Sequence, residues 1–265
     1  MSDNASTPRV GAVSYLNTLP LVWGMLHGDE SEAVDLSFSI PSVCAQRVEQ
    51  GLIDIGLVPV AEIARQNLEI VPGVGITCLG TVRSILLFSR VQWHRVRTLA
   101  ADVSSRTSVQ LARVILRERY GVEPEIRSEQ PVLTDMLRDA DAALIIGDPA
   151  LRLRPEDIPY ESLDLGAEWL ALTGLPMVFA AWAGKPGIPS SLLEQILHAS
   201  YRFGEQRIGE IVDQEYAARG VTREVAERYL RHHIRFELGP REQQGLETFL
   251  DLAGLPARGV VEGVL

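Results

Sequence analysis

The order of buried strand, polar corner and helix occurs twice in this chain. In the first copy, residues 10–13 (V-G-A-V) are an apolar run typical of a strand buried on both faces, and residues 19–26 begin a helix with proline at the second position. In the second copy, a strand at 98–103 (T-L-A-A-D-V) precedes a helix at 109–120 that ends at Gly121. A chain with this pattern is expected to form an α/β fold.

Each copy continues to another buried strand. Residues 52–60 (L-I-D-I-G-L-V-P-V) and 141–147 (D-A-A-L-I-I-G) both follow a predicted helix and contain an aspartate. The first is closed by Pro59 and the second by Asp148-Pro149. A half-buried strand at 35–40 and helices at 41–50 and 133–139 complete the alternation. Strands that alternate with helices pair in parallel through crossover connections, so we expect two similar α/β lobes.

Two extended apolar runs lie outside these units, at 84–89 (S-I-L-L-F-S) and 175–183 (L-P-M-V-F-A-A-W-A). We expect them to cross between the lobes, and a mostly helical tail from Pro189 to return to the first lobe. The predicted architecture is a two-lobed clamp, with residues 1–86 and 182–265 in one lobe and 87–181 in the other. Ligands of such folds bind at the carboxyl ends of the strands.

Composition narrows the function classes. With 46% hydrophobic and 23% charged residues the chain has an ordinary globular composition, and no apolar run approaches the roughly 20 residues of a membrane helix. A net charge of −10 argues against a nucleic-acid-binding surface. The polar start has no secretory signal pattern, and Cys44 and Cys78 are isolated, so we expect reduced thiols and a cytoplasmic protein without membrane or nucleic-acid partners.

The sequence offers little for a metal or nucleotide. Five histidines have no metal-ligand spacing with each other or with cysteine: His27, His94, His198, His232 and His233. The pair Gly73 and Gly75 does not open a helix as a dinucleotide fingerprint requires. We therefore expect neither a metal nor a cofactor.

The corner after the first strand carries Ser14, Asn17 and Thr18. Free backbone N–H groups at a helix start and neighbouring polar side chains form a site for an anion or polar ligand. The alternative is that these three residues only cap the helix.

The second corner, 104–108, reads S-S-R-T-S. Ser105, Thr107 and Ser108 with Arg106 could hold a carboxylate through hydroxyl, guanidinium and helix N–H donors. The alternative is a hydroxyl cap beside a solvated arginine.

Three further places could contribute to a site. Arg83 and Ser84 lie where a clamp would close, although they could be ordinary hinge residues. Asp148 follows a strand end and could be an acid, a base or a turn residue, and Asp-Pro slightly favours the turn. Thr173 and Leu175 offer a hydroxyl and an apolar wall for a ring.

Several longer segments resemble the MqnA family, the chorismate dehydratases of the futalosine pathway of menaquinone biosynthesis. The matching segments are S-Y-L-N-T-L-P (14–20), P-V-A-E-I-A-R (59–65), S-I-L-L-F-S (84–89), S-S-R-T-S (104–108), D-A-A-L-I-I-G-D (141–148), D-L-G-A-E-W (164–169) and T-G-L-P-M-V-F-A-A-W-A (173–183). The resemblance extends from about residue 9 to 252. It implies a type II periplasmic-binding-protein-like fold and a cytoplasmic, cofactor-independent hydro-lyase that converts chorismate to 3-[(1-carboxyvinyl)oxy]benzoate.

The resemblance also implies roles for single residues. One carboxylate of chorismate would bind at Ser105–Ser108 near Arg106, and the other near Asn17 and Thr18 with Ser84 across the cleft. Asn17 would orient a hydroxyl or carboxylate, because an amide is no base. The base would be Asp148 or the carboxylate of the substrate itself.

Further substrate contacts are assigned to residues in the matching segments: Ser14, Pro59, Arg83, Gly147, Thr173, Leu175 and Phe179. Other functions remain open at this point. They are a non-catalytic solute-binding protein for small anions, the effector domain of a transcription regulator, and the sister enzyme of the pathway, which acts on cyclic de-hypoxanthine futalosine.

Overall fold

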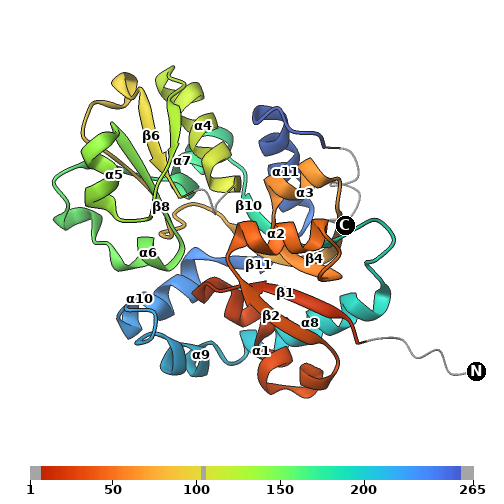
Figure 1. Ribbon diagram of the computed structural model, residues 1–265. Coiled ribbons are helices and arrows are strands. Elements are labelled where there is room, and N and C mark those ends of the chain that lie inside the picture. Colours follow the sequence, from red (N-terminus) through yellow and green to blue (C-terminus); the bar gives the residue numbers. More distant parts are fainter. Residues whose placement is uncertain (1–6, 103–105, 258–265) are drawn as a thin grey trace, which may run out of the picture.

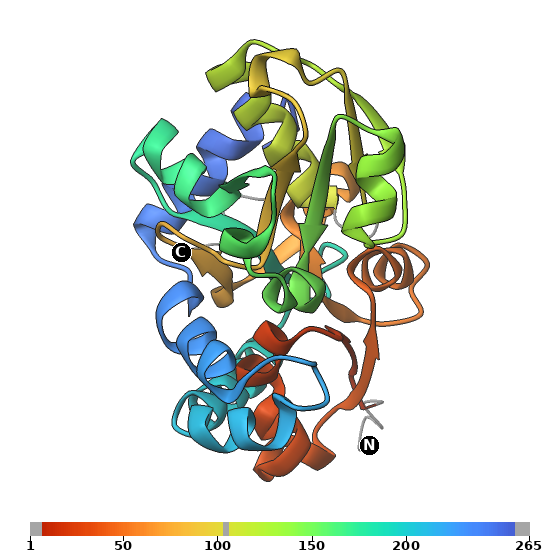
Figure 2. The ribbon, with the colours of Figure 1, turned by 90° about the vertical axis from the view of Figure 1, so that its left-hand side faces the viewer.

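Two β-sheets divide the protein into two lobes (Figure 1; Figure 2). The computed structural model describes residues 7–102 and 106–257. The first sheet has the order β11-β4-β10-β3-β1-β2, and the second has the order β7-β6-β8-β5-β9. Strands of the first sheet are β1 (Arg9–Val13), β2 (Asp35–Ser39), β3 (Ile55–Pro59), β4 (Glu69–Cys78), β10 (Met177–Gly184) and β11 (Arg235–Glu237). Strands of the second are β5 (Ile85–Ser89), β6 (Thr98–Ala101), β7 (Glu125–Ser128), β8 (Ala142–Ile146) and β9 (Glu161–Asp164).

The two sheets repeat one design. In each, three strands pair in parallel, β2-β1-β3 and β7-β6-β8, and a fourth strand, β10 or β5, joins them antiparallel. The aspartates that precede β3 and β8 also correspond. Asp54 accepts a hydrogen bond from the backbone N–H of Arg9 at 2.8 Å, and Asp141 accepts one from that of Arg97 at 2.9 Å. The predicted α/β, two-lobed fold is confirmed.

Helices cover the faces of the sheets. Those of the first lobe and the C-terminal tail are α1 (Leu19–His27), α2 (Pro41–Glu49), α3 (Val60–Gln66), α8 (Ser191–Glu205), α9 (Ile208–Glu215), α10 (Arg223–Arg228) and α11 (Pro240–Leu252). The second lobe has α4 (Arg106–Tyr120), α5 (Leu133–Asp139), α6 (Gly147–Arg152) and α7 (Leu165–Thr173). Short 3₁₀ turns are η1 (Leu16–Thr18), η2 (Asp29–Glu32), η3 (Trp93–Arg95) and η4 (Pro155–Asp157), and η5 (Tyr229–His233) is a π-helix. None of the helices within 7–102 and 106–257 is long and apolar enough to cross a membrane.

The chain passes between the lobes at residues 79–84 and 174–176. The two apolar runs that we expected to make these crossings lie inside the sheets instead. β5 sits between β8 and β9, and β10 sits between β3 and β4. Their apolar side chains therefore reflect burial between neighbouring strands rather than passage between lobes. The predicted lobe boundaries at 86/87 and 181/182 fall within β5 and β10, which belong to the second and the first sheet respectively.

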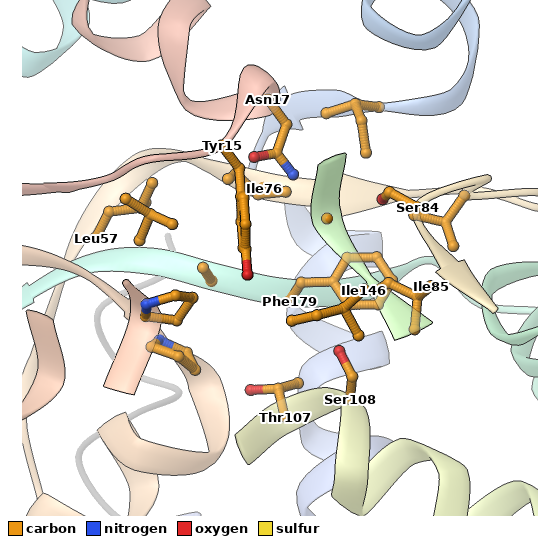
Figure 3. A pocket seen from close by; sticks show the side chains of 17 residues that line it. Tyr15, Asn17, Leu57, Ile76, Ser84, Ile85, Thr107, Ser108, Ile146 and Phe179 are labelled. Carbon is orange, nitrogen blue, oxygen red and sulfur yellow. The ribbon is translucent and has the colours of Figure 1, made fainter. Parts of the chain in front are cut away.

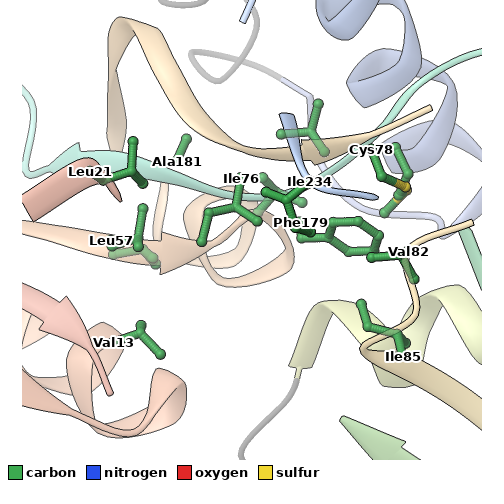
Figure 4. Close-up of a cluster of buried hydrophobic side chains, with 14 of the residues drawn as sticks. Val13, Leu21, Leu57, Ile76, Cys78, Val82, Ile85, Phe179, Ala181 and Ile234 are labelled. Carbon is green, nitrogen blue, oxygen red and sulfur yellow. The ribbon is translucent and has the colours of Figure 1, made fainter. Parts of the chain in front are cut away.

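Hydrophobic packing continues from the first sheet into the first crossing segment. Figure 4 shows Phe179 of β10 and Ile76 of β4 near Val82 and Ile85, all of which are buried. On the far side of the crossings, α11 packs against β10, and its Leu252 carbonyl accepts a hydrogen bond from Arg117 of α4 at 2.7 Å. The four side chains named from Figure 4 also line a pocket between the lobes.

Candidate active site

A pocket of about 570 Å³, including its mouth, lies between the lobes (Figure 3). The ends of β1, β3 and β8, the start of β5 and the first turn of α4 surround it, which is where open α/β sheets bind ligands. Most of its wall is apolar: Val13, Pro41, Leu57, Pro59, Ile76, Val82, Ile85, Ile146, Phe179, Ala180 and Ile234. The polar side chains that line it are those of Tyr15, Asn17, Ser84, Thr107 and Ser108.

Asn17 and Ser84 meet through a tyrosine from the C-terminal tail. The Asn17 side-chain nitrogen donates a hydrogen bond to the Tyr229 hydroxyl at 3.0 Å, and that hydroxyl donates to Ser84 Oγ at 2.9 Å. Tyr229 is buried, and burial raises the pKa of its phenol above the usual range. The carbonyl oxygen of the Asn17 side chain is buried and has no protein partner.

The first polar corner does not act as a helix cap. It forms the 3₁₀ turn η1, and no side chain caps either η1 or α1. Asn17 instead extends into the pocket (Figure 3). The other two residues of this prediction do not line the pocket. Ser14 is exposed and its hydroxyl donates to the Ser39 carbonyl at 3.4 Å, and Thr18, the last residue of η1, is fully buried.

The Arg83 side chain hydrogen-bonds backbone carbonyls and does not extend into the pocket. It adopts a left-handed conformation (φ 65°), and its N–H donates to the Asp164 carboxylate at 2.6 Å. Its guanidinium donates to the carbonyls of Ala150 and Leu153, and burial lowers its pKa. A non-glycine residue with positive φ is uncommon, and here it precedes Ser84 at the pocket wall. The Arg83 side chain, predicted to contact substrate, does not line the pocket.

The second polar corner is only partly in the pocket. Thr107 and Ser108, in the first turn of α4, point their side chains toward it from the side opposite Asn17 (Figure 3). Thr107 Oγ1 also accepts the N–H of Ala61 from the other lobe at 3.2 Å. Arg106 points away, since its Nε lies 3.8 Å from the Glu62 carboxylate and its side chain is 60% exposed. Ser105 lies outside the described residues.

Asp148 is buried beside the pocket but does not line it. Its Oδ1 accepts the backbone N–H of Leu16 at 3.0 Å, and its Oδ2 pairs with Arg219 at 2.8 Å. The role of general base predicted for Asp148 does not fit this geometry, because both oxygens face protein donors. Gly147, which does line the pocket, has φ 63° and packs against the Tyr15 ring. Its N–H donates to the Ser84 carbonyl at 2.8 Å.

Thr173 and Leu175, which we predicted to contact a ring, make hydrogen bonds at the end of α7 instead. Thr173 donates its hydroxyl to the Trp169 carbonyl at 2.9 Å and accepts the Leu175 N–H at 3.2 Å. Neither Thr173 nor Leu175 lines the pocket, and both hydrogen bonds of the Thr173 hydroxyl stay within its own helix end. Pro59 and Phe179, in contrast, form part of its apolar wall.

Sequence reasoning missed Tyr15, Tyr229 and Arg219. Tyr15 stands within the first corner, between two residues that we singled out, and its aromatic ring was a usable signal. Tyr229 and Arg219 lie in the helical tail, where no local pattern marks them.

The pocket wall is uncharged. Among the described residues that line it there is no aspartate, glutamate, histidine, lysine or arginine. Within residues 7–102 and 106–257 there is also no group of three acidic, histidine or cysteine side chains that could hold a metal ion. The pocket can thus shape, desolvate and hydrogen-bond a ligand through hydroxyl and amide groups.

Residues 8–254 match the model of a protein family described as menaquinone biosynthesis. The chain belongs to this family. Two curated proteins of similar sequence are named chorismate dehydratase. The one from Thermus thermophilus is 28% identical over 93% of this chain and 95% of its own length, and the one from Campylobacter jejuni is 26% identical over 91% and 95%.

Solved structures agree on the fold of this menaquinone biosynthesis protein. A protein of Archaeoglobus fulgidus superposes with a TM-score of 0.74 at 14% identity, covering 93% of this chain and 96% of the other. The periplasmic aliphatic sulphonate binding protein SsuA of Escherichia coli superposes with a TM-score of 0.64 at 13% identity, covering 97% and 91%. The expected periplasmic-binding-protein-like fold is confirmed.

Proposed function

We propose that this protein is a chorismate dehydratase, which converts chorismate to 3-[(1-carboxyvinyl)oxy]benzoate and water in menaquinone biosynthesis. The observation that carries the proposal is the end-to-end similarity to two chorismate dehydratases within one family. We further propose that the reaction occurs in the cytoplasm and without a cofactor.

The reaction does not require a strong acid or base from the protein. Loss of the proton at C3 of chorismate gives a dienolate conjugated with the ring carboxylate, and loss of the C4 hydroxyl then makes the ring aromatic. Aromatisation supplies the driving force. The protein must hold two carboxylates, stabilise the charge that develops and assist the departing hydroxyl.

Hydrogen-bond donors on two sides of the pocket suit these two carboxylates. One carboxylate would bind at the first turn of α4, where Thr107, Ser108 and the helix N–H groups act as donors. The other would accept from Ser84. The buried Asn17 carbonyl oxygen, which has no protein partner, would accept from the C4 hydroxyl and hold it in line for departure.

The base that removes the C3 proton is then the substrate itself. No ionisable acid or base stands among the described pocket-lining residues apart from the Tyr15 phenol, and both oxygens of Asp148 are engaged. The enolpyruvyl carboxylate is joined to C3 through one ether oxygen and reaches the C3 hydrogen through a six-membered ring. The proton leaves with the C4 oxygen as water, so no proton is gained or lost. Intramolecular proton transfer of this kind benefits from a high effective molarity.

The direct test is incubation of the purified protein with chorismate, followed by ultraviolet spectroscopy and mass analysis. Loss of one water with a benzoate-type spectrum establishes the reaction. Protein dialysed against a chelator is expected to keep its rate. Unchanged chorismate with folded protein would refute the proposal, and cyclic de-hypoxanthine futalosine would then be tested as the substrate.

A further inference from the structure

The helix that carries Tyr229 changes its geometry at this residue. α10 ends at Arg228, and the π-helix η5 follows it directly, with the Ile234 N–H bonded to the Tyr229 carbonyl at 3.2 Å. π-Helical turns are rare and occur frequently at functional sites. Here the turn buries Tyr229 to 1% exposure, with its hydroxyl between two polar side chains of the pocket.

A phenol has one proton to donate, and the Tyr229 hydroxyl donates it to Ser84 Oγ. The same hydroxyl accepts from the Asn17 side-chain nitrogen. Ser84 Oγ is therefore an acceptor toward Tyr229, which leaves the Ser84 proton for a different acceptor. Because the Asn17 nitrogen is held by Tyr229, the Asn17 carbonyl oxygen faces the other way, and it is the buried atom that lacks a protein partner.

We propose that Tyr229 is a positioning residue that sets the hydrogen-bond polarity of the pocket, so that Asn17 presents an acceptor and Ser84 presents a donor to the ligand. This inference rests on the proposed function for its ligand groups. An acceptor at Asn17 selects the ring hydroxyl of chorismate, and a donor at Ser84 selects a carboxylate. A site of the opposite polarity would bring a donor to the hydroxyl and an acceptor to the anion.

Two observations support a fixed rather than a variable polarity. Burial keeps the Tyr229 phenol protonated well into the alkaline range, so its proton is always present for Ser84. The three residues also come from three distant parts of the chain, and among the described residues only Tyr229 hydrogen-bonds both of the other side chains. Removal of the Tyr229 hydroxyl would free the Asn17 amide to rotate and the Ser84 hydroxyl to turn.

The test is the Tyr229→Phe variant, which keeps the ring and removes the hydroxyl. We expect kcat/KM for chorismate to fall by roughly 10- to 100-fold, as for loss of one buried hydrogen-bond partner. Tyr201→Phe is the matched control. Tyr201 is also buried, and its hydroxyl donates to Glu205 at 3.0 Å away from the pocket, so its loss should leave kcat/KM unchanged.

Two further measurements separate positioning from a general structural role. In a double-mutant cycle with Ser84→Ala, Tyr229→Phe should cost less than it costs alone, because the part of its effect that passes through Ser84 is already lost. The side-chain amide resonances of Asn17, assigned by their loss in Asn17→Ala, should shift in Tyr229→Phe and stay in place in Tyr201→Phe. Additive effects in the cycle, or unmoved Asn17 resonances, would overturn the proposal.

The resonance measurement needs no substrate. Wild-type protein that leaves chorismate unchanged while its Asn17 resonances respond to Tyr229→Phe would refute the dehydratase function and keep the polarity assignment. Wild-type protein that converts chorismate while the resonances do not respond would keep the function and refute the role of Tyr229.

Discussion

The carboxylate of Asp148, in the second lobe, accepts the backbone N–H of Leu16, in the first lobe, at 3.0 Å. The same carboxylate pairs with Arg219, whose Nη1 also donates to the Ser14 carbonyl at 2.8 Å. These bonds fasten the turn that carries Tyr15 and Asn17 to the opposite lobe. Asp148 thus stabilises the contact between the two lobes beside the pocket.

Asp148→Asn should affect stability more than chemistry. We expect the free energy of unfolding to fall by about 1–3 kcal/mol, because asparagine keeps one acceptor oxygen and its nitrogen cannot accept from the second donor, whether that is the Leu16 N–H or Arg219. The value of kcat should fall by no more than about tenfold, since Asp148 does not touch the pocket. Urea unfolding and steady-state kinetics measure the two effects. A variant of normal stability with no turnover would instead make Asp148 the base.

Gly147→Ala tests the contact between Gly147 and Tyr15. A Cβ at Gly147 would lie 2.7 Å from two carbon atoms of the Tyr15 ring, so the ring must move. Gly174→Ala is the control, because Gly174 has a similar φ (71° against 63°) and nothing within 4 Å of its added Cβ. Both variants should lose about 1–2 kcal/mol of stability from the left-handed backbone. Gly147→Ala should in addition lose at least about tenfold in kcat/KM, and equal activities of the two variants would contradict this.

Asn17→Asp would put a carboxylate into a pocket that we propose binds a dianion. We expect kcat/KM for chorismate to fall by about 100-fold or more, since a carboxylate at residue 17 would repel the carboxylates of the substrate in the same pocket, and like-charge juxtaposition costs several kcal/mol. Gln92→Glu makes the same amide-to-acid change at an exposed position of the second lobe and should leave the kinetics unchanged. A normal KM for Asn17→Asp would show that no anion approaches Asn17.

The two thiols should be unreactive and should weaken the fold in alkali. Burial raises the pKa of Cys44 to about 12 and also raises that of Cys78. Ellman's reagent should label neither thiol in native protein at pH 8 and both in denatured protein.

The sign of the stability effect follows from the raised folded-state pKa of Cys44. Its contribution is complete below the unfolded pKa near 9 and is lost as the pH rises toward 12, at about 1.4 kcal/mol per pH unit. Unfolding measured between pH 8.5 and 10.5 should show a shallower decline for Cys44→Ala than for wild type. Equal slopes would refute this assignment.

The fold was largely predictable because its signals are local. Alternating strands and helices, and aspartates at equivalent positions such as Asp54 and Asp141, occur within short windows of sequence. The site was predictable only where a polar side chain directly follows a strand or begins a helix, as with Asn17 and Thr107. Arg83 and Arg106 were assigned to ligand binding, but in the fold backbone carbonyls and Glu62 are their partners. Arg219 meets Asp148 across 71 residues of chain, a pairing that no local pattern indicates.

The pocket and the hinge share atoms at Ser84. Its hydroxyl accepts from Tyr229 of the tail, while its carbonyl, on the first crossing between the lobes, accepts from Gly147 of the second lobe. A rotation of one lobe against the other must therefore turn the Ser84 hydroxyl with it. We therefore expect a substitution that changes how the lobes meet, such as one at the contact of Arg117 with α11, to alter turnover without touching the pocket.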